Sequence, residues 1–198
     1  MRLNGPAWDR FGWRHFDSAS AEVIHGVDIA AGTSVAGTTI GIINTSPTWA
    51  GSGSGTTQQS GGGFWAVGRS VKGYVRGTTT TGATPGTITI DVRLDTTGGA
   101  AVMTSGALTL LASQTTSSWE LFFDITCRTL GSAGTLFGMG RWTAGTALFA
   151  AGSAMLPATA PATTTIDTTA NHVFVVCVTE SQAGTSSITQ MAIWGARD

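Results

Sequence analysis

The sequence carries very little charge for a chain of 198 residues. Charged residues make up 11% of it, against about 25% in a typical soluble domain. Lys72 is the single lysine, and glutamate occurs at only three positions. Coiled coils and helical bundles need abundant Ala, Glu, Lys and Leu at a helical spacing, so this composition excludes both classes.

The sequence also lacks a regular glycine repeat, long apolar runs and clustered positive charge, and each absence excludes a further class of protein. The 28 glycines have no three-residue period, which excludes a collagen helix. No apolar run reaches the ~18 residues of a membrane span, and Asp9, Arg10 and Arg14 interrupt any signal-peptide core. A net charge of −1 with scattered arginines disfavours nucleic acid as a partner. We therefore expect an unexported chain that binds neither nucleic acid nor membrane, and its 41% hydrophobic residues are enough to bury a core.

Alternating apolar and polar residues predict β-strands in the last two-thirds of the chain. Thr87–Leu94 reads TITIDVRL, so its apolar residues all face one side. Trp119–Arg128 repeats this alternation, whereas His172–Thr179 is apolar on both faces, which is typical of a covered strand. The other candidates are Ile188–Trp194 and, with weaker patterns, Phe64–Arg76, Ala107–Ala112, Thr135–Trp142 and Ala147–Ala151.

Turn-forming clusters separate the predicted strands, beginning with TTTTGATPG at 78–86 and DTTGG at 95–99. About eight strands without an intervening amphipathic helix predict an antiparallel β-sandwich, and this number favours a jelly roll. We assign residues 63–198 to such an all-β, jelly-roll-like domain. Threonine, at 34 positions, suits it because a β-branched side chain favours strand geometry.

Residues 1–62 precede the predicted sandwich, and we interpret them as an extended N-terminal arm. The run from residue 51 reads GSGSGTTQQSGGG, which is typical of a flexible linker. Upstream of it, Asp17 to Ser20 favour the start of a short helix ending near His25. Large aromatic rings in the arm need cover, either from the chain's own sandwich or from a neighbouring subunit. The candidate interface residues are Trp8, Phe11, Trp13 and Phe16.

Motifs of enzymes and metal sites are mostly absent from the sequence. The dipeptide Gly-Lys does not occur, which excludes a Walker A loop, and no Gly-x-Gly-x-x-Gly fingerprint is present. No histidine has a second His or Cys at metal-ligand spacing. Pairs such as His15 with Asp17, or His25 with Asp28, are better interpreted as solvated polar residues than as a metal or general-base site. We predict no cofactor, no metal and no catalytic residue.

Two pairs of carboxylates are the remaining candidates for chemistry. Asp91 and Asp95 flank Arg93 on one face of a predicted strand, and Glu120 and Asp124 share the polar face of another. Glycoside hydrolysis uses two carboxylates, but we interpret both pairs as groups that solvate an outer strand face. The two cysteines are Cys127 and Cys177. We expect both thiols to be reduced and buried, either apart or in contact across the sheet.

Several of the predicted strands and turns have a pattern that points to a family. These are the Thr-rich strand TITIDVRL, the opening WEL of a later strand, the turn RTLGSAGT, and TIDTT ahead of the last apolar strands. The segments 73–142 and 163–197 that contain them resemble a group of tailed-bacteriophage virion structural proteins, found on the head or the tail. The resemblance covers about two-thirds of the chain and excludes the first 60 residues. It carries over no active-site residues.

The resemblance implies a non-enzymatic structural protein of a phage virion, assembled in the host cytoplasm. We expect a capsid decoration (cement) protein that stabilises the head by binding across major capsid subunits. Its partners would be copies of itself, as a homotrimer, and the major capsid protein or another virion protein. The alternative is a tail or fibre component that binds a host surface receptor or glycan, with Trp49 or Trp142 stacking on the sugar.

Overall fold

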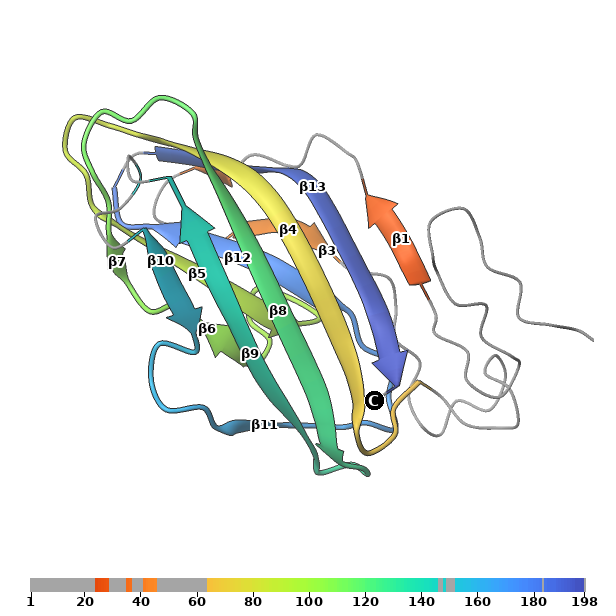
Figure 1. The fold of residues 1–198 in the computed structure, drawn as a ribbon. Coiled ribbons are helices and arrows are strands. Elements are labelled where there is room, and N and C mark those ends of the chain that lie inside the picture. Colours follow the sequence, from red (N-terminus) through yellow and green to blue (C-terminus); the bar gives the residue numbers. More distant parts are fainter. Residues whose placement is uncertain are drawn as a thin grey trace, which may run out of the picture.

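The computed structural model describes an all-β chain (Figure 1). It describes residues 24–28, 35–36, 41–45, 64–145, 148, 152–182 and 184–197, and the side chains of 64–145, 148 and 152–182. Within these ranges the regular secondary structure consists of β-strands alone, and the strands pair in antiparallel fashion. The predicted all-β, antiparallel architecture is confirmed.

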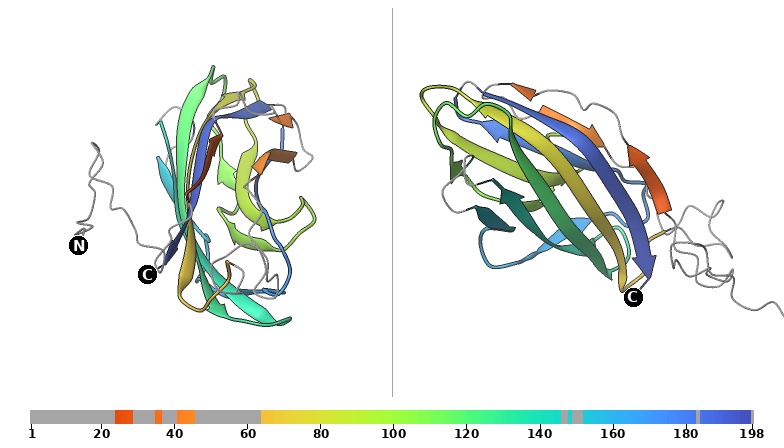
Figure 2. Two further views of the ribbon diagram at one scale, coloured as in Figure 1. Left: turned by 90° about the vertical axis from the view of Figure 1, so that its right-hand side faces the viewer. Right: turned by 45° about the horizontal axis from the view of Figure 1, so that its top comes forward.

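The strands form two sheets that pack against each other, as the left view of Figure 2 shows from the side. The larger sheet has the order β1-β13-β4-β8-β9-β10, with β11 paired to β9 and β2 paired to β13. Its strands are β1 (Ile24–Asp28), β2 (Val35–Ala36), β4 (Arg69–Thr81), β8 (Ser117–Thr129), β9 (Gly134–Ala144), β10 (Ser153–Leu156), β11 (Thr163–Ile166) and β13 (Gly184–Arg197). The smaller sheet has the order β3-β12-β5-β6, with β7 paired to β5. Its strands are β3 (Gly41–Thr45), β5 (Thr87–Leu94), β6 (Ala101–Thr104), β7 (Leu108–Thr109) and β12 (Phe174–Glu180).

Eight of these strands follow the order of a jelly roll. Along the chain, β1, β3, β4, β5, β6, β8, β12 and β13 are strands 1 to 8 of this set. The larger sheet then reads 1-8-3-6 and the smaller sheet reads 2-7-4-5, which is the order that two Greek keys produce in a jelly roll. Strands β9, β10 and β11 are inserted between the sixth and seventh strands and extend the larger sheet beyond β8.

Strands β1, β2 and β3 lie within residues 1–62, where the sequence predicts an arm. β1 and β2 pair with β13, and β3 pairs with β12, so these segments belong to the two sheets. The boundary at residue 62 and the arm itself stay predictions. The candidate interface residues Trp8, Phe11, Trp13 and Phe16 lie outside the described residues.

The core between the sheets is formed by the strand faces that alternation predicts. In β5, the four apolar residues of TITIDVRL are at most 4% exposed, and β12 is buried on both faces as expected. In β8, alternate residues are buried in the same way, each at most 4% exposed. They are Trp119, Leu121, Phe123, Ile125 and Cys127.

Glycines of the larger sheet make room for one ring of this core. Phe123 of β8 pairs with Gly73 of β4 on one side and with Gly140 of β9 on the other. A Cβ atom at Gly73 would overlap the Phe123 ring, and one at Gly140 would lie 2.7 Å from the Phe122 carbonyl oxygen. The ring therefore occupies the space that a side chain at Gly73 would need, whereas a side chain at Gly140 would meet the backbone of β8.

The Thr-rich segment 78–81, predicted as the start of a turn, is instead the end of strand β4. Its hydroxyls are used inside the protein: the Trp119 indole N–H donates to Thr79 Oγ1 at 3.1 Å, and Thr81 Oγ1 donates to the Leu111 carbonyl at 2.7 Å. Because threonine combines a β-branched shape with a hydroxyl, it can fill a strand and satisfy a buried polar partner.

Other strand predictions differ from the structure in position. Ile24 and His25 belong to β1, so the helix expected to end near His25 is wrong at those residues. β10 begins at Ser153, beyond the predicted Ala147–Ala151. Strands β6 and β11 were not predicted, because four-residue strands give too short an alternation to recognise.

Candidate functional site: the outer face of the larger sheet

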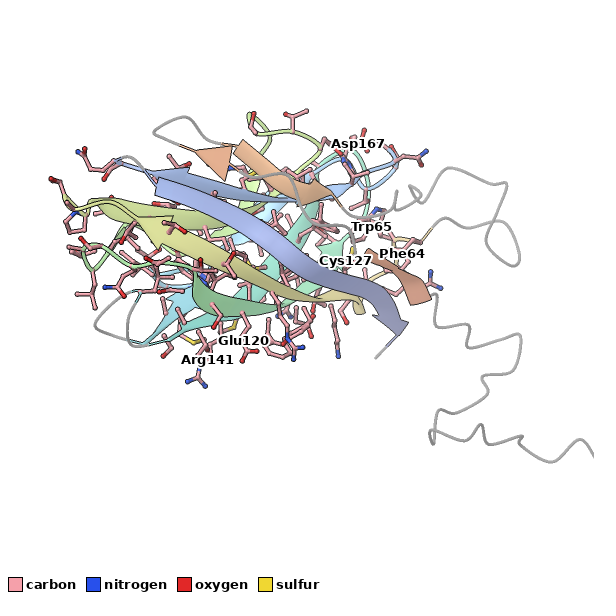
Figure 3. The ribbon with its side chains drawn as sticks, turned by 90° about the horizontal axis from the view of Figure 1, so that it is seen from above. Phe64, Trp65, Glu120, Cys127, Arg141 and Asp167 are labelled. Atoms are coloured by element: carbon pink, nitrogen blue, oxygen red, sulfur yellow. The ribbon has the colours of Figure 1, made fainter. Side chains whose placement is uncertain are left out.

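The outer face of the larger sheet is built from rows of side chains that the strand register aligns. In one row Tyr74 of β4 is opposite Phe122 of β8, which is opposite Arg141 of β9, which is opposite Met155 of β10. Directly opposite residues on neighbouring strands share a face of the sheet. Figure 3 shows Glu120 and Arg141 close together on this side of the molecule, with Phe64 and Trp65 elsewhere.

Large apolar side chains are exposed on this face. Phe122 is 51% exposed, Met139 is 40% exposed and Met155 is 52% exposed. They border a shallow hollow of about 370 Å³, to which Gly73 and Gly140 also contribute. Clustered apolar exposure of this kind marks an interaction surface more often than scattered single residues do.

The charged groups around the hollow are mostly engaged. Lys72 Nζ lies 3.5 Å from Asp124 Oδ2. The Tyr74 hydroxyl donates to Glu120 Oε2 at 2.8 Å. The guanidinium of Arg76 lies 4.5 Å from the centre of the Tyr74 ring, which is a cation–π contact.

Arg141 differs from these neighbours. It is exposed, and no hydrogen bond, ion pair or ring contact joins it to the rest of the described chain. Its cross-strand neighbours are Phe122 and Met155. Among the side chains that the structure describes, the face therefore presents one unpaired cation beside apolar residues. Arg, Phe and Met are residue types enriched at protein–protein interfaces.

The carboxylates Glu120 and Asp124 do not form a glycosidase pair. They are four residues apart on β8, which places their backbones ~13 Å apart in an extended strand. The two carboxyl groups of a glycosidase lie about 5–9.5 Å apart. Phe122 stands between them on the same face, and each carboxylate has its own local partner.

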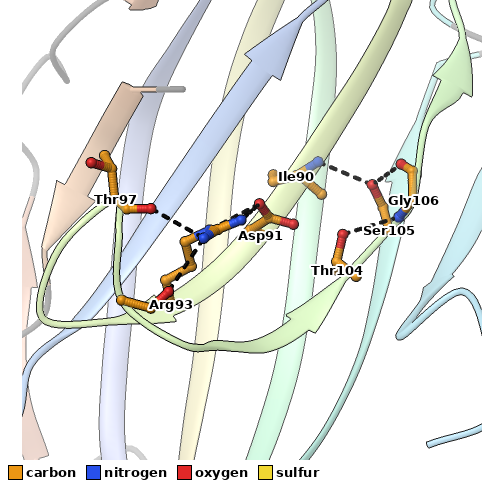
Figure 4. A network of polar contacts seen from close by, with 8 residues as sticks. Ile90, Asp91, Arg93, Thr97, Thr104, Ser105 and Gly106 are labelled. Atoms are coloured by element: carbon orange, nitrogen blue, oxygen red, sulfur yellow. Dashed lines mark hydrogen bonds and ion pairs between the residues drawn. The ribbon is translucent and has the colours of Figure 1, made fainter. Parts of the chain in front are cut away.

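Asp91 is buried, contrary to the expectation that it solvates an outer strand face. It is 4% exposed, and its Oδ2 accepts from Arg93 Nε at 3.0 Å and Nη2 at 2.9 Å (Figure 4). Arg93 Nη1 also donates to the carbonyls of Thr97 and Gly99 at 3.1 and 3.2 Å. The turn after β5 therefore folds back onto Arg93. Asp91 and Arg93 form an internal ion pair.

His172 contacts Asp95, the other carboxylate of the first candidate pair. Its Nδ1 lies 2.8 Å from Asp95 Oδ2, and its Nε2 lies 2.8 Å from the Asp167 carbonyl oxygen. Asp95 Oδ1 also accepts the Val173 backbone N–H at 3.0 Å. Both ring nitrogens face oxygen acceptors, so neither is directed at a hydroxyl or thiol, as the base of a catalytic triad would be. The contact fastens the loop before β12 to the end of β5.

The structure describes some of the other histidine and tryptophan residues that the sequence singles out. No group of three or more His, Cys, Asp or Glu suited to a metal lies within the described residues. His25 is in β1, and His15 and Trp49 lie outside the described part of the chain. Trp142 is 0% exposed, so the expectation that it stacks on a sugar is wrong.

The two cysteines are free, buried thiols, as predicted. They lie on different sheets, Cys127 in β8 and Cys177 in β12. Burial raises the pKa of both thiols because it desolvates the thiolate, and the pKa of Cys177 reaches about 11. The positive charge of Arg93 lowers the pKa of Cys177, and the negative charge of Asp91 raises it further.

The raised pKa of Cys177 predicts a pH-dependent loss of stability. The pKa of Cys177 in the folded chain lies above the ordinary value of 9.0. The stability that the protonated thiol contributes to the folded state is therefore fully present below pH 9 and is lost as the pH rises towards 11. Two pKa units correspond to about 2–3 kcal/mol. Urea unfolding between pH 8 and 11 measures this, with Cys177→Ala as the comparison. The variant should lose stability less steeply with pH than the wild type, and parallel slopes would contradict the assignment.

No protein-family model matches the chain, and no curated protein matches it. Within its described part, no helix is long and apolar enough to cross a membrane. The site is therefore interpreted from its own geometry: a flat sheet face with exposed apolar side chains, paired charges around them and one unpaired arginine.

Proposed function

We propose that the chain is a non-enzymatic structural protein of a phage virion, and that it acts as a capsid decoration protein. The observation that carries the proposal is the exposed apolar face of the larger sheet, formed by Phe122, Met139 and Met155. Such a face suits contact with another protein surface. The jelly-roll sandwich is compatible with this role, as is the resemblance of segments 73–142 and 163–197 to virion proteins.

The proposed role is mechanical. A protein that binds only the assembled shell stabilises it by mass action, because disassembly must also release the bound protein. Low charge suits extended contacts of this kind, since few ions need to be desolvated at the interface. In this proposal the residues that precede β1 extend over neighbouring subunits and bury Trp8, Phe11, Trp13 and Phe16, whereas β1, β2 and β3 stay in the two sheets.

Particle fractionation tests the proposal. In a lysate of cells that produce the chain from its natural gene context, we expect the chain to co-sediment with virus particles in a density gradient. It should leave the particle fraction when particles are dissociated. A chain found entirely in the slowly sedimenting fraction contradicts the proposal.

A truncated chain tests the arm separately. Removing residues 1–17 deletes all four aromatic residues of the candidate interface. We expect occupancy of particles to fall while the thermal unfolding of the sandwich stays unchanged. Full occupancy by the truncated chain would rule out the arm contact and leave the sheet face as the binding surface.

A glycan-binding tail or fibre protein is the second candidate. The Tyr74–Phe122 ring pair, with centroids 4.3 Å apart, is the observation that favours it, because Phe122 is half exposed and aromatic faces stack on sugars. A glycan array with the wild type and Phe122→Ala separates the two candidates. Binding to a defined glycan that Phe122→Ala abolishes would favour the second.

A further inference from the structure

Four residues at the centre of the outer face form a self-complementary arrangement. Asp124 and Phe122 lie on β8, and Met139 and Arg141 lie on β9. The register pairs Asp124 with Met139 and Phe122 with Arg141. The two charged residues therefore occupy one diagonal of this four-residue unit, and the two apolar residues occupy the other.

Neither charged residue of the unit is fully satisfied within one chain. Arg141 has no partner in the described residues. Asp124 has a side chain that is 45% exposed, and its Oδ2 contacts Lys72 at 3.5 Å. Its Oδ1 is buried without a hydrogen-bond partner, so Oδ2 is the oxygen that a further cation can reach. Asp124 and Arg141 lie on a diagonal of the unit and form no ion pair with each other. A carboxylate can hold a lysine and an arginine together, so Asp124 has room for a second cation.

We infer that two copies of the chain pack face to face through this surface, related by a two-fold axis parallel to the Phe122–Met139 diagonal. Rotation about this axis exchanges the ends of the other diagonal. Arg141 of one copy then meets Asp124 of the partner subunit, and the same contact occurs a second time by symmetry. Phe122 and Met139 lie along the axis, so each packs against its own counterpart.

The surroundings of the unit support this pairing over an unrelated occupant. Three apolar residues that border the hollow, Phe122, Met139 and Met155, are each at least 40% exposed in one copy. A second copy covers them with the same apolar surface. Methionine side chains adapt readily to such contacts because they are flexible and unbranched. The face also carries both signs of charge, which a second copy of the same face complements.

This inference does not depend on the proposed function, but it uses the same sheet face. In such a dimer the face is buried, so a capsid contact would then rely on the N-terminal residues. A two-fold pairing of sheet faces is also different from the homotrimer that the family resemblance implies. The mass of the particle in solution distinguishes a dimer from a trimer directly. A decoration protein that dimerises in this way and a dimer with no role in a virion are equally compatible with the inference.

Charge reversal tests the contact between Arg141 and the partner's Asp124. We expect analytical ultracentrifugation of the full chain to show a monomer–dimer equilibrium. Arg141→Asp places two carboxylates together at each contact, and Asp124→Arg places arginines together; each should raise the dimer dissociation constant by about 100-fold. The double variant, with both changes, recreates the opposite charges and should return the dissociation constant to within about tenfold of the wild-type value.

A matched control and the melting curve keep the test decisive. Ala100→Glu changes the charge at an exposed position on the turn after β5 and should leave the dimer unchanged. Thermal unfolding of each variant shows whether it is folded, and Phe122→Ser, which changes no charge, is a second route to the monomer. A wild-type monomer, a trimer, a dimer insensitive to Arg141→Asp, or a double variant that fails to re-form the dimer each overturns the inference.

Discussion

Arg93→Ala should lower the free energy of unfolding by about 2–4 kcal/mol, because it leaves a buried carboxylate without its counter-ion. Breaking a buried ion pair by removing one partner typically costs about 3–5 kcal/mol. Arg93 is 24% exposed in its side chain, so water reduces this somewhat, whereas Asp91 is only 5% exposed. The substitution also removes the two hydrogen bonds to the Thr97 and Gly99 carbonyls. Urea unfolding at neutral pH measures the loss.

The double variant Asp91→Ala/Arg93→Ala separates the effect of the unpaired Asp91 carboxylate from the effect of losing the Arg93 hydrogen bonds. It loses the same hydrogen bonds to the turn, but it leaves no unpaired carboxylate. We therefore expect the double variant to be more stable than Arg93→Ala alone. Equal or lower stability of the double variant would show that the buried charge is not the source of the loss.

Gly73→Ala should destabilise the chain by about 1–2 kcal/mol, although replacing a glycine in a strand usually has the opposite effect. Alanine restricts the unfolded chain, which by itself favours folding by about 0.4–1 kcal/mol. At Gly73, however, the new Cβ overlaps three atoms of the Phe123 ring, which is itself 4% exposed. Forcing atoms into a packed core costs typically about 1–3 kcal/mol.

The sign of this change is the test, and Gly98→Ala is its control. A Cβ at Gly98 meets nothing closer than the Thr96 hydroxyl oxygen at 3.9 Å. Chemical denaturation should show Gly98→Ala within about 0.5 kcal/mol of the wild type, as for most surface changes. If Gly73→Ala is as stable as the wild type or more stable, the Phe123 ring does not occupy the space above Gly73.

Much of the sandwich could be predicted from alternation. In TITIDVRL the apolar residues are all buried, and the bounds Thr87–Leu94 agree with β5. Strand patterns of this kind identify a face because successive side chains point in opposite directions. The jelly-roll order depends on which strands pair, including short strands such as β1 and β3, and local sequence carries little information about such pairing.

The polar contacts were less predictable than the strands. Asp91 was expected on a solvated face, and its burial depends on a turn that returns over Arg93 and on the neighbouring strand β12. The Asp95–His172 contact joins residues 77 positions apart. Alternation assigns a polar residue to a face, but it does not indicate what covers that face.

The candidate site was predicted only as a polar strand face. Glu120 and Asp124 were recognised there, whereas Arg141, Met139 and Met155 were not, because β9 has a weak pattern and β10 was predicted in another place. Their proximity to Phe122 follows from the pairing of β8, β9 and β10. The alternation of Phe122 with buried Leu121 and Phe123 was the one local signal that an apolar residue faces outward.

Peroxide oxidation of individual methionines most directly tests the central claim that a second copy of the chain covers the outer face of the larger sheet. Met139 and Met155 are exposed in one chain, whereas Met103 is 2% exposed in the core and is an internal reference. We expect Met139 and Met155 to oxidise rapidly in dilute protein and in the Arg141→Asp variant. In concentrated wild-type protein, their rates should fall towards that of Met103. Rates that stay high and equal under all these conditions would contradict the account.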